Sequence, residues 1–301
     1  MAHRLALVLV DAANPFQQLL RQDAEAAARK AGVALETTFT GESFTNHLAA
    51  LRRLVSDPST RPDAFVVMAV RDQGLEKVVH EAAAAGVHWF LVNAVEDDFE
   101  PIRREFPAVT VSTFCPDELE TGRIQGHQMH ALAGRGRRVL YLEGNPRSLT
   151  SRQRAAGMRE ATAGSGIEVV FAAHDWDPAQ AAQTVREWLR LSVAGRRPFD
   201  LVTGQNDAIA EAAREVLVAA AREPGREDLA RVPVTGCDGA PEGGLKAVRE
   251  GRLTATVVLP RCAGPAVEAA ARLLSRGQRP SRVIALRPES FPTLEELRPS
   301  A

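Results

Sequence analysis

The chain has 301 residues, of which 45% are hydrophobic and 25% are charged. This composition is typical of a soluble globular protein with room for two domains, and it excludes a disordered or fibrous chain. The formal net charge is −1. Because nucleic-acid binding depends on a basic excess, we expect no nucleic-acid partner.

The amino terminus and the cysteines bear on the compartment. The apolar run 5–10 is short and Asp11 follows it at once, so it predicts a buried strand and not a signal peptide. No apolar run reaches membrane length, so we expect no membrane insertion. Three scattered cysteines do not form a disulfide framework: Cys115, Cys237 and Cys262. The expected location is cytoplasmic if Met1 is the native start, and periplasmic or otherwise extracytoplasmic if a signal was removed.

Short apolar runs, each followed by a turn and a helical stretch, recur along the chain. They are residues 5–10, 64–70, 87–93, 138–142, 167–172, 199–203 and 232–236. Continuous apolar strands that alternate with helices indicate parallel sheets covered by helices on both faces. We find no flexible linker, which predicts α/β lobes joined by several chain crossings.

The loops after the early strands carry candidate ligand-binding residues, because ligands of open parallel sheets bind beyond the carboxyl ends of the strands. Asn14 suits the cap of the next helix, and capping alone explains it as well as ligand binding does. Phe16 follows at the helix start, where its ring could lie on the apolar face of a ligand. Arg71 either faces solvent or points a cation at the ligand, and Asn93 is the first polar side chain after its strand.

The second half of the chain adds four candidates. Arg154 and Arg152 are two residues apart and cannot share a helical face, so at most one faces a ligand. Trp176 ends a strand with a large rigid surface, which serves either a ligand or packing under its own loop.

Two further loops end in amide and carboxylate groups. We expect Asp207 to cap the next helix and to leave Asn206 free to donate and accept hydrogen bonds. Asp238 stands among glycines, which let the backbone approach a ligand closely, and its carboxylate can accept from two hydroxyls. Together the loops offer the polar and aromatic groups that a polyol needs.

No catalytic or cofactor motif is present. The chain lacks a phosphate-binding glycine loop, a dinucleotide fingerprint and a nucleophile elbow. His127 and His130 are three residues apart but lack further metal ligands. Nothing pairs a nucleophile with a base, so we expect no enzyme activity, no cofactor and no metal.

Five segments carry a resemblance to a known family: Asn14-Pro15-Phe16, 151–158, Gln205-Asn206-Asp207, Gly236-Cys237-Asp238-Gly239 and 245–256. In this order, over nearly the whole chain, they resemble the type I periplasmic sugar-binding proteins of ABC transporters. The resemblance is to the ribose-binding kind, whose fold is shared by the effector domains of lactose-repressor-type regulators.

The resemblance implies two Rossmann-like lobes, each a parallel sheet flanked by helices, joined by a hinge of three crossovers. The first lobe would comprise 1–113 plus 258–286, and the second 114–257 plus 287–301. The resemblance also implies that a sugar contacts the positions of Asn14, Phe16, Arg154, Asn206 and Asp238. Trp176 stands where similar proteins often carry an aromatic residue.

One departure from the family bears on the ligand. Similar proteins carry Asp-Arg after the fourth strand, where this chain has Asn93-Ala94, and Arg71 brings a charge on a different loop. We therefore expect a ligand other than ribose, and Arg71 with Arg154 suggests an acidic or phosphorylated sugar.

The predicted function is a monomeric solute-binding protein that closes around a small polar ligand, a sugar or sugar derivative, for uptake by an ABC permease. Two alternatives stay open. One is a cytoplasmic sensor of the same fold that signals to a kinase or regulator. The other is an enzyme that uses the same cleft.

Overall fold

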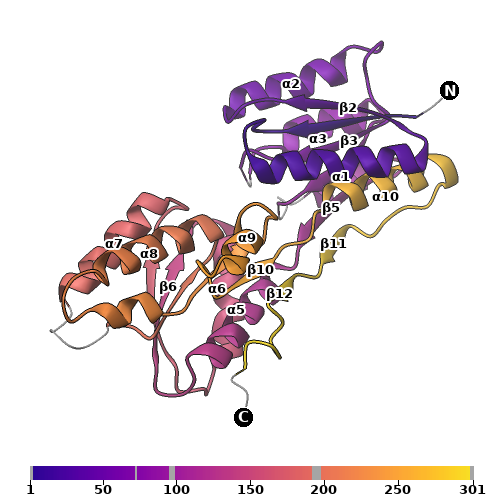
Figure 1. Ribbon diagram of the computed structural model, residues 1–301. Helices are drawn as coiled ribbons and strands as arrows, with labels where there is room; N and C mark the ends of the chain where they lie inside the picture. Colours follow the sequence, from indigo (N-terminus) through magenta and orange to yellow (C-terminus); the bar gives the residue numbers. More distant parts are fainter. Residues whose placement is uncertain (1–2, 72, 95–98, 192–197, 299–301) are drawn as a thin grey trace. The chain divides into compact units, whose positions relative to one another are not determined.

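Figure 1 shows the computed structural model of the protein, which describes residues 3–71, 73–94, 99–191 and 198–298. The chain divides into two compact units. Unit 1 comprises 1–116 and 260–286, and unit 2 comprises 117–259 and 287–301. The chain passes between the units three times, and both units are α/β, so the predicted fold class is confirmed.

Unit 1 is built on a parallel sheet of six strands in the order β11-β5-β4-β3-β1-β2. The strands are β1 (Arg4–Leu9), β2 (Ala34–Phe39), β3 (Ala64–Met68), β4 (His88–Val92), β5 (Val111–Pro116) and β11 (Val283–Leu286). The helices are α1 (Pro15–Ala31), α2 (Phe44–Ser56), α3 (Glu76–Ala84), α4 (Glu100–Glu105) and α10 (Ala263–Arg276).

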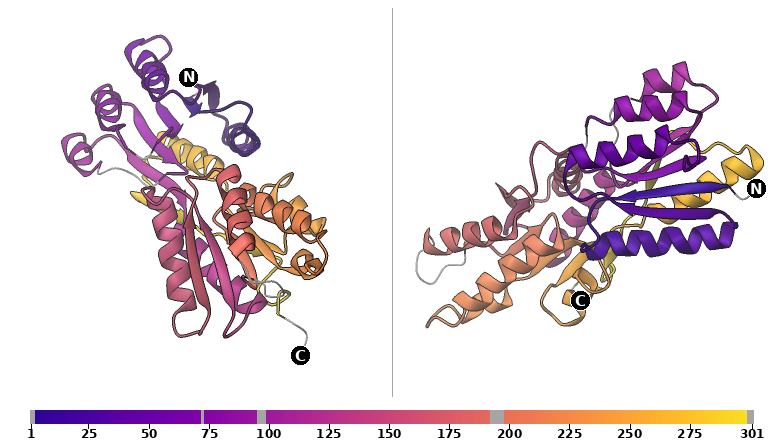
Figure 2. Two further views of the ribbon diagram at one scale, coloured as in Figure 1. Left: turned by 90° about the vertical axis from the view of Figure 1, so that its left-hand side faces the viewer. Right: turned by 90° about the horizontal axis from the view of Figure 1, so that it is seen from above.

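Helices cover both faces of this sheet (Figure 2). Leu5, Leu7 and Leu9 of β1 pack with α1 and α10 on one face, while Ala6 and Val8 pack with α2 and α3 on the other. Because successive side chains of a strand point to opposite faces, a strand buried on both faces is apolar at every position. This is why β1 reads as an unbroken apolar run.

Unit 2 is built on a second sheet of six strands in the order β12-β10-β9-β8-β6-β7, with only β12 antiparallel to its neighbour. The strands are β6 (Arg138–Glu143), β7 (Glu168–Ala173), β8 (Leu201–Gly204), β9 (Val234–Asp238), β10 (Ala255–Val258) and β12 (Glu289–Phe291). The helices are α5 (Glu118–Leu132), α6 (Leu149–Thr162), α7 (Pro178–Leu191), α8 (Asp207–Ala220), α9 (Gly244–Arg249) and the 3-10 helix η1 (Glu227–Arg231).

The core of unit 2 also has two layers. Helices α7 and α8 pack on one face against Leu140, Leu142 and Val202, and α5 and α6 pack on the other against Val139 and Tyr141. Within the described part of the chain, no helix is both long and apolar enough to cross a membrane.

A buried histidine lies in the core of unit 1. His47 of α2 is fully buried, and its Nδ1 lies 2.8 Å from Oγ1 of Thr40. Its Nε2 has no hydrogen-bond partner among the described residues. Burial lowers the pKa of His47 to about 4, because a protonated ring would hold a charge and an unpaired N–H away from water.

This pKa predicts that unit 1 loses stability in mild acid. The folded state resists protonation of His47 until about pH 4, whereas the unfolded chain takes up the proton near its ordinary pKa of 6.5. Stability is therefore fully present above pH 6.5 and falls as the pH drops towards 4. Between pH 7.5 and pH 4.5, His47 should remove about 2.5 kcal/mol from the free energy of unfolding.

The measurement is urea unfolding at both pH values in the background Trp176→Phe, Trp188→Phe, followed by the fluorescence of Trp89, which is buried in the core cluster against which α2 packs. His47→Gln does not titrate and is the control. An equal loss in the variant and the wild type would contradict the assignment.

Candidate functional site

The eight candidate residues lie on segments that follow the carboxyl ends of parallel strands, four in each unit. Unit 1 holds Asn14, Phe16, Arg71 and Asn93, and unit 2 holds Arg154, Trp176, Asn206 and Asp238. In each unit these strand ends meet at one edge of the sheet, so each group of four shares an edge.

The loop after β1 is held by its own side chains. Oδ1 of Asn14 accepts from the backbone N–H groups of Phe16 at 3.0 Å and Gln17 at 3.2 Å, which confirms the predicted cap. The buried amide of Gln17, which the sequence did not reveal, accepts from the N–H groups of Val10 and Asp11. Phe16, the second residue of α1, is half-buried against the core of unit 1.

Arg71 and Asn93 differ in how far the protein satisfies them. The guanidinium of Arg71 is exposed, stacks 3.6 Å above the ring centroid of Phe44 and donates to the carbonyl of Gln73. Asn93 has a φ of 58°, and its buried Oδ1 finds no donor among the described residues. The Oδ1 of Asn93 is therefore available to accept a hydrogen bond, while the guanidinium of Arg71 already has partners.

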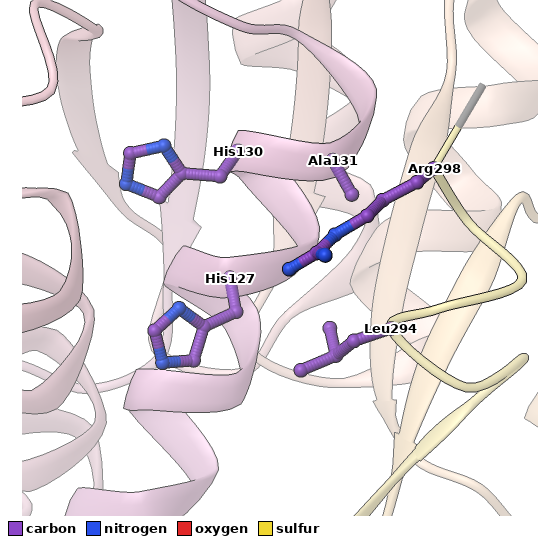
Figure 3. Close-up of a pocket in the computed structure, with 5 residues that line it drawn as sticks. All are labelled: His127, His130, Ala131, Leu294 and Arg298. Carbon is purple, nitrogen blue, oxygen red and sulfur yellow. The ribbon is translucent and has the colours of Figure 1, made fainter. Parts of the chain in front are cut away.

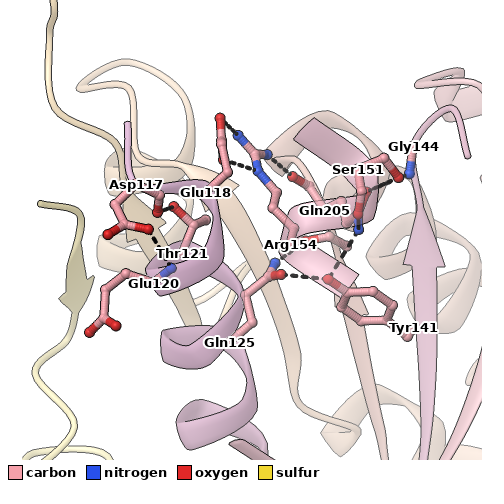
Figure 4. A network of polar contacts seen from close by, with 11 residues as sticks. Asp117, Glu118, Glu120, Thr121, Gln125, Tyr141, Gly144, Ser151, Arg154 and Gln205 are labelled. Carbon is pink, nitrogen blue, oxygen red and sulfur yellow. Dashed lines mark hydrogen bonds and ion pairs between the residues drawn. The ribbon is translucent and has the colours of Figure 1, made fainter. Parts of the chain in front are cut away.

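Arg154 lies in a buried ion pair that the sequence did not predict. Its Nε and Nη2 donate to the two carboxylate oxygens of Glu118 at 2.6 and 3.2 Å, and its Nη1 donates to the carbonyl of Gln205 at 2.6 Å (Figure 4). Arg154 is 4% exposed and Glu118 is 6% exposed. Such a bidentate ion pair is strong because both groups are charged and two N–H donors face two carboxylate oxygens.

The pair forms because α5 and α6 approach each other closely. A Cβ atom at Gly122 of α5 would run into the carbonyl of Arg154, and one at Gly157 of α6 would run into the carbonyl of Leu119. The two glycines therefore bring the backbones together and set Glu118 beside Arg154.

The loop after β8 corrects one prediction. Asn206 and not Asp207 caps α8, because Oδ1 of Asn206 accepts from the N–H of Ile209 at 2.8 Å. The buried carboxylate of Asp207 turns to the next strands instead. It accepts from the N–H of Gly239 at 2.8 Å and from Oγ1 of Thr256 at 2.7 Å.

Two glycines near Asp238 make room for a neighbouring side chain. A Cβ atom at Gly236 or Gly244 would collide with the carboxylate of Asp207. These two glycines therefore help to position Asp207, and the close approach of a ligand to the backbone at this loop stays a prediction.

Asp238 is half-buried at the end of β9, next to Asp207. Its φ of 121° lies in a region that residues other than glycine rarely adopt. Burial, with the carboxylate of Asp238 nearby, raises the pKa of Asp207, and burial likewise raises that of Asp238. Two carboxylates in one poorly solvated place disfavour ionisation of each other.

Trp176, in the loop after β7, lies near Arg154 of α6. The indole lies so close on Gly144 that a Cβ atom there would collide with the ring. The guanidinium of Arg154 is 5.9 Å from the ring centroid. Asp175 and Trp176 both have positive φ, at 47° and 64°. The half-buried indole also packs on the core beneath it, which agrees with the packing interpretation, while its contact with a ligand stays a prediction.

A separate surface pocket of unit 2 carries no comparable set of groups. His127, His130, Ala131, Leu294 and Arg298 line it (Figure 3). A ring nitrogen of His130 is 3.0 Å from the carbonyl of Ala161. Within the described ranges, no cluster of three or more His, Cys, Asp or Glu residues could hold a metal ion.

Comparison with known proteins identifies the family. Residues 5–277 match the periplasmic binding protein domain. The chain belongs to this family. One relative is the ribose import binding protein RbsB of Salmonella typhimurium, which is 27% identical over 84% of this chain and 78% of its own length.

Solved structures agree on the fold of this periplasmic binding protein domain. One is a solute-binding protein of an ABC transporter from Actinobacillus succinogenes with bound D-allose, with a TM-score of 0.80, 19% identity and coverage of 98% and 99% of the two chains. Another is a periplasmic ribose ABC transporter protein from Conexibacter woesei, also with a TM-score of 0.80 and 19% identity, covering 98% and 94%.

The buried ion pair predicts a large asymmetry between single and double variants. Glu118→Leu leaves the guanidinium of Arg154 buried without its partner and should lower the free energy of unfolding by about 3–5 kcal/mol. Glu118→Leu combined with Arg154→Met removes both charges and should recover most of that loss. Urea unfolding followed by circular dichroism measures both effects.

The same two helices offer a control. Arg123 of α5 and Glu160 of α6 form an exposed ion pair with an Nη2–Oε2 distance of 2.8 Å. Glu160→Gln should have little effect, because water screens this pair. A Glu118→Leu protein as stable as the wild type would show that the buried pair does not matter.

Proposed function

We propose that the protein is a solute-binding protein that closes around a neutral, hydroxyl-rich ligand, a sugar or sugar-like polyol, and delivers it to an ABC-type permease. Its membership of the periplasmic binding protein family supports this function. The ribose import binding protein RbsB and the solute-binding protein with bound D-allose support the ligand class. In this proposal the ligand is bound and released unchanged.

The observation that carries the proposal is the location of the residues with a strained backbone. Among the described residues other than glycine, positive φ occurs at Asn93, Asp175, Trp176 and Asp238. Three of these four are ligand-binding candidates chosen from the sequence. Strained residues persist where the surrounding structure over-determines them, which happens most often at ligand-binding sites.

The chemistry of these three residues suits a sugar. The carboxylate of Asp238 can accept from two neighbouring hydroxyls, and the buried Oδ1 of Asn93 needs a donor. The indole of Trp176 offers a flat apolar surface to a sugar ring.

The charges favour a neutral ligand over the acidic one that the sequence suggested. Arg154 is paired with Glu118, and Arg71 is stacked on Phe44. At these strand ends of unit 2 the guanidinium of Arg154 is already paired with Glu118, and it stands near Asp207 and Asp238, whose pKa values are raised by burial. A sugar acid or sugar phosphate would bring a further negative charge to a place where carboxyl groups already disfavour ionisation, so we replace the acidic ligand by a neutral polyol.

A thermal-shift screen tests the function and the ligand class together. The panel contains neutral pentoses, hexoses and polyols, with sugar acids and sugar phosphates as the charged set. A ligand of the folded protein at 100 times its Kd should add about 2.7 kcal/mol to stability. We expect selective hits in the neutral set. A flat panel would contradict sugar binding, and hits confined to the charged set would contradict a neutral ligand.

Two substitutions test the assigned residues once a hit is known. Asp238→Ala should weaken binding by more than about tenfold, because a buried hydroxyl left unpaired costs about 1–3 kcal/mol. Asn206→Asp keeps the capping oxygen but loses the amide donor, so binding should weaken while α8 stays capped. Isothermal titration calorimetry measures both. Wild-type affinity in both variants would rule out this site.

A further inference from the structure

The side chain of Gln205 joins β6, the loop after β6 and α6 (Figure 4). It is fully buried and follows β8 directly. Its side-chain Oε1 accepts from the N–H of Gly144 at 2.9 Å and from Oγ of Ser151 at 2.7 Å. Its Nε2 donates to the carbonyl of Ser151 at 2.9 Å and to Oη of Tyr141 at 3.2 Å.

The amide of Gln205 has no capacity left for a ligand. A carboxamide has two N–H groups and two acceptor positions, and the four hydrogen bonds above use all of them. Oη of Tyr141 in turn donates to Oε1 of Gln125, whose Nε2 donates to the carbonyl of Gly204. A fully satisfied buried network of this kind fixes the positions of its members.

Two candidate ligand-binding residues, Trp176 and Arg154, depend on hydrogen bonds made by Gln205. The indole of Trp176 packs against the backbone of Gly144. The hydrogen bond from Gly144 to Gln205 therefore fixes the position of the surface on which that ring lies. The carbonyl of Gln205 also accepts from Nη1 of Arg154. Its side chain and its backbone therefore act on an aromatic surface and on a guanidinium that lie 5.9 Å apart.

We propose that Gln205 is a positioning residue, which fixes the face that Trp176 presents to the ligand without touching the ligand itself. This inference rests on the proposed sugar-binding function. It predicts that Gln205 changes the affinity for the ligand indirectly, through the backbone of Gly144.

A second buried glutamine provides a matched control. Gln128 of α5 is also fully buried in unit 2, and its Nε2 donates to the carbonyl of Thr256 at 3.2 Å and to Oγ of Ser290 at 3.0 Å. Gln128→Met removes a buried amide of the same kind as Gln205→Met does, but it leaves the hydrogen bond to Gly144 in place. Both variants should lose stability.

The experiment isolates the fluorescence of Trp176 by replacing the other two tryptophans with phenylalanine, in the variant Trp89→Phe, Trp188→Phe. In this background we compare Gln205→Met, Gln205→Glu and Gln128→Met. Emission is recorded without ligand, and affinity is measured for the best sugar of the thermal-shift panel.

We expect Gln205→Met to shift the emission of Trp176 and to weaken affinity by about tenfold or more, and Gln128→Met to leave both close to the background protein. Gln205→Glu keeps an oxygen that accepts from Gly144, so it should lie nearer to the background protein in both measurements. This milder variant keeps the test valid if Gln205→Met fails to fold.

The outcomes separate this inference from the proposed function. If no sugar binds the wild type, the function fails, and the emission of Trp176 alone still tests whether Gln205 positions the ring. If a sugar binds and Gln205→Met changes neither emission nor affinity, the inference is overturned. It is also overturned if Gln128→Met produces the same changes, because the effect would then be general destabilisation.

Discussion

The charge on Arg154 is the constraint around which unit 2 is organised at its strand ends. A guanidinium removed from water needs a partner of opposite charge and acceptors for its remaining N–H groups, or the fold loses several kcal/mol. Glu118 and the carbonyl of Gln205 meet these needs. The close crossing of α5 and α6, with its two glycines, brings Glu118 within reach of Arg154, and the residue that supplies the carbonyl is also the centre of the buried hydrogen-bonded network.

The architecture could be predicted from the sequence because most of its strands are buried on both faces. The runs that became β1 and β3 have no polar interruption that would hide them, and β4 has four consecutive apolar residues after His88. The edge strand β2 was not among the predicted runs, because three consecutive polar residues, 36–38, interrupt it and it is only partly buried. The three-residue β12 could not be found from pattern alone, since its pairing with β10 joins residues far apart in the sequence.

The candidate residues could be located from the sequence, but their partners could not. Strand ends are visible as the place where an apolar run stops at a polar side chain. Glu118 has no such signal, since 36 residues separate it from Arg154. Asn206 and Asp207 are both able to cap a helix, and local rules do not separate them. The choice was made by Gly239 and Thr256, which offer donors to Asp207 from neighbouring strands.

The left-handed backbone at Trp176 and Asp238 has an evolutionary consequence. Glycine would occupy either position at lower conformational cost, since strain of this kind is worth about 1–3 kcal/mol per residue. Selection for thermal stability alone would therefore favour glycine at Asp238, whereas the packing of the indole on the core opposes that exchange at Trp176. Among descendants of this chain, heat resistance gained by glycine at Asp238 would come with lost recognition, and mutations that stabilise the protein without that loss would arise elsewhere.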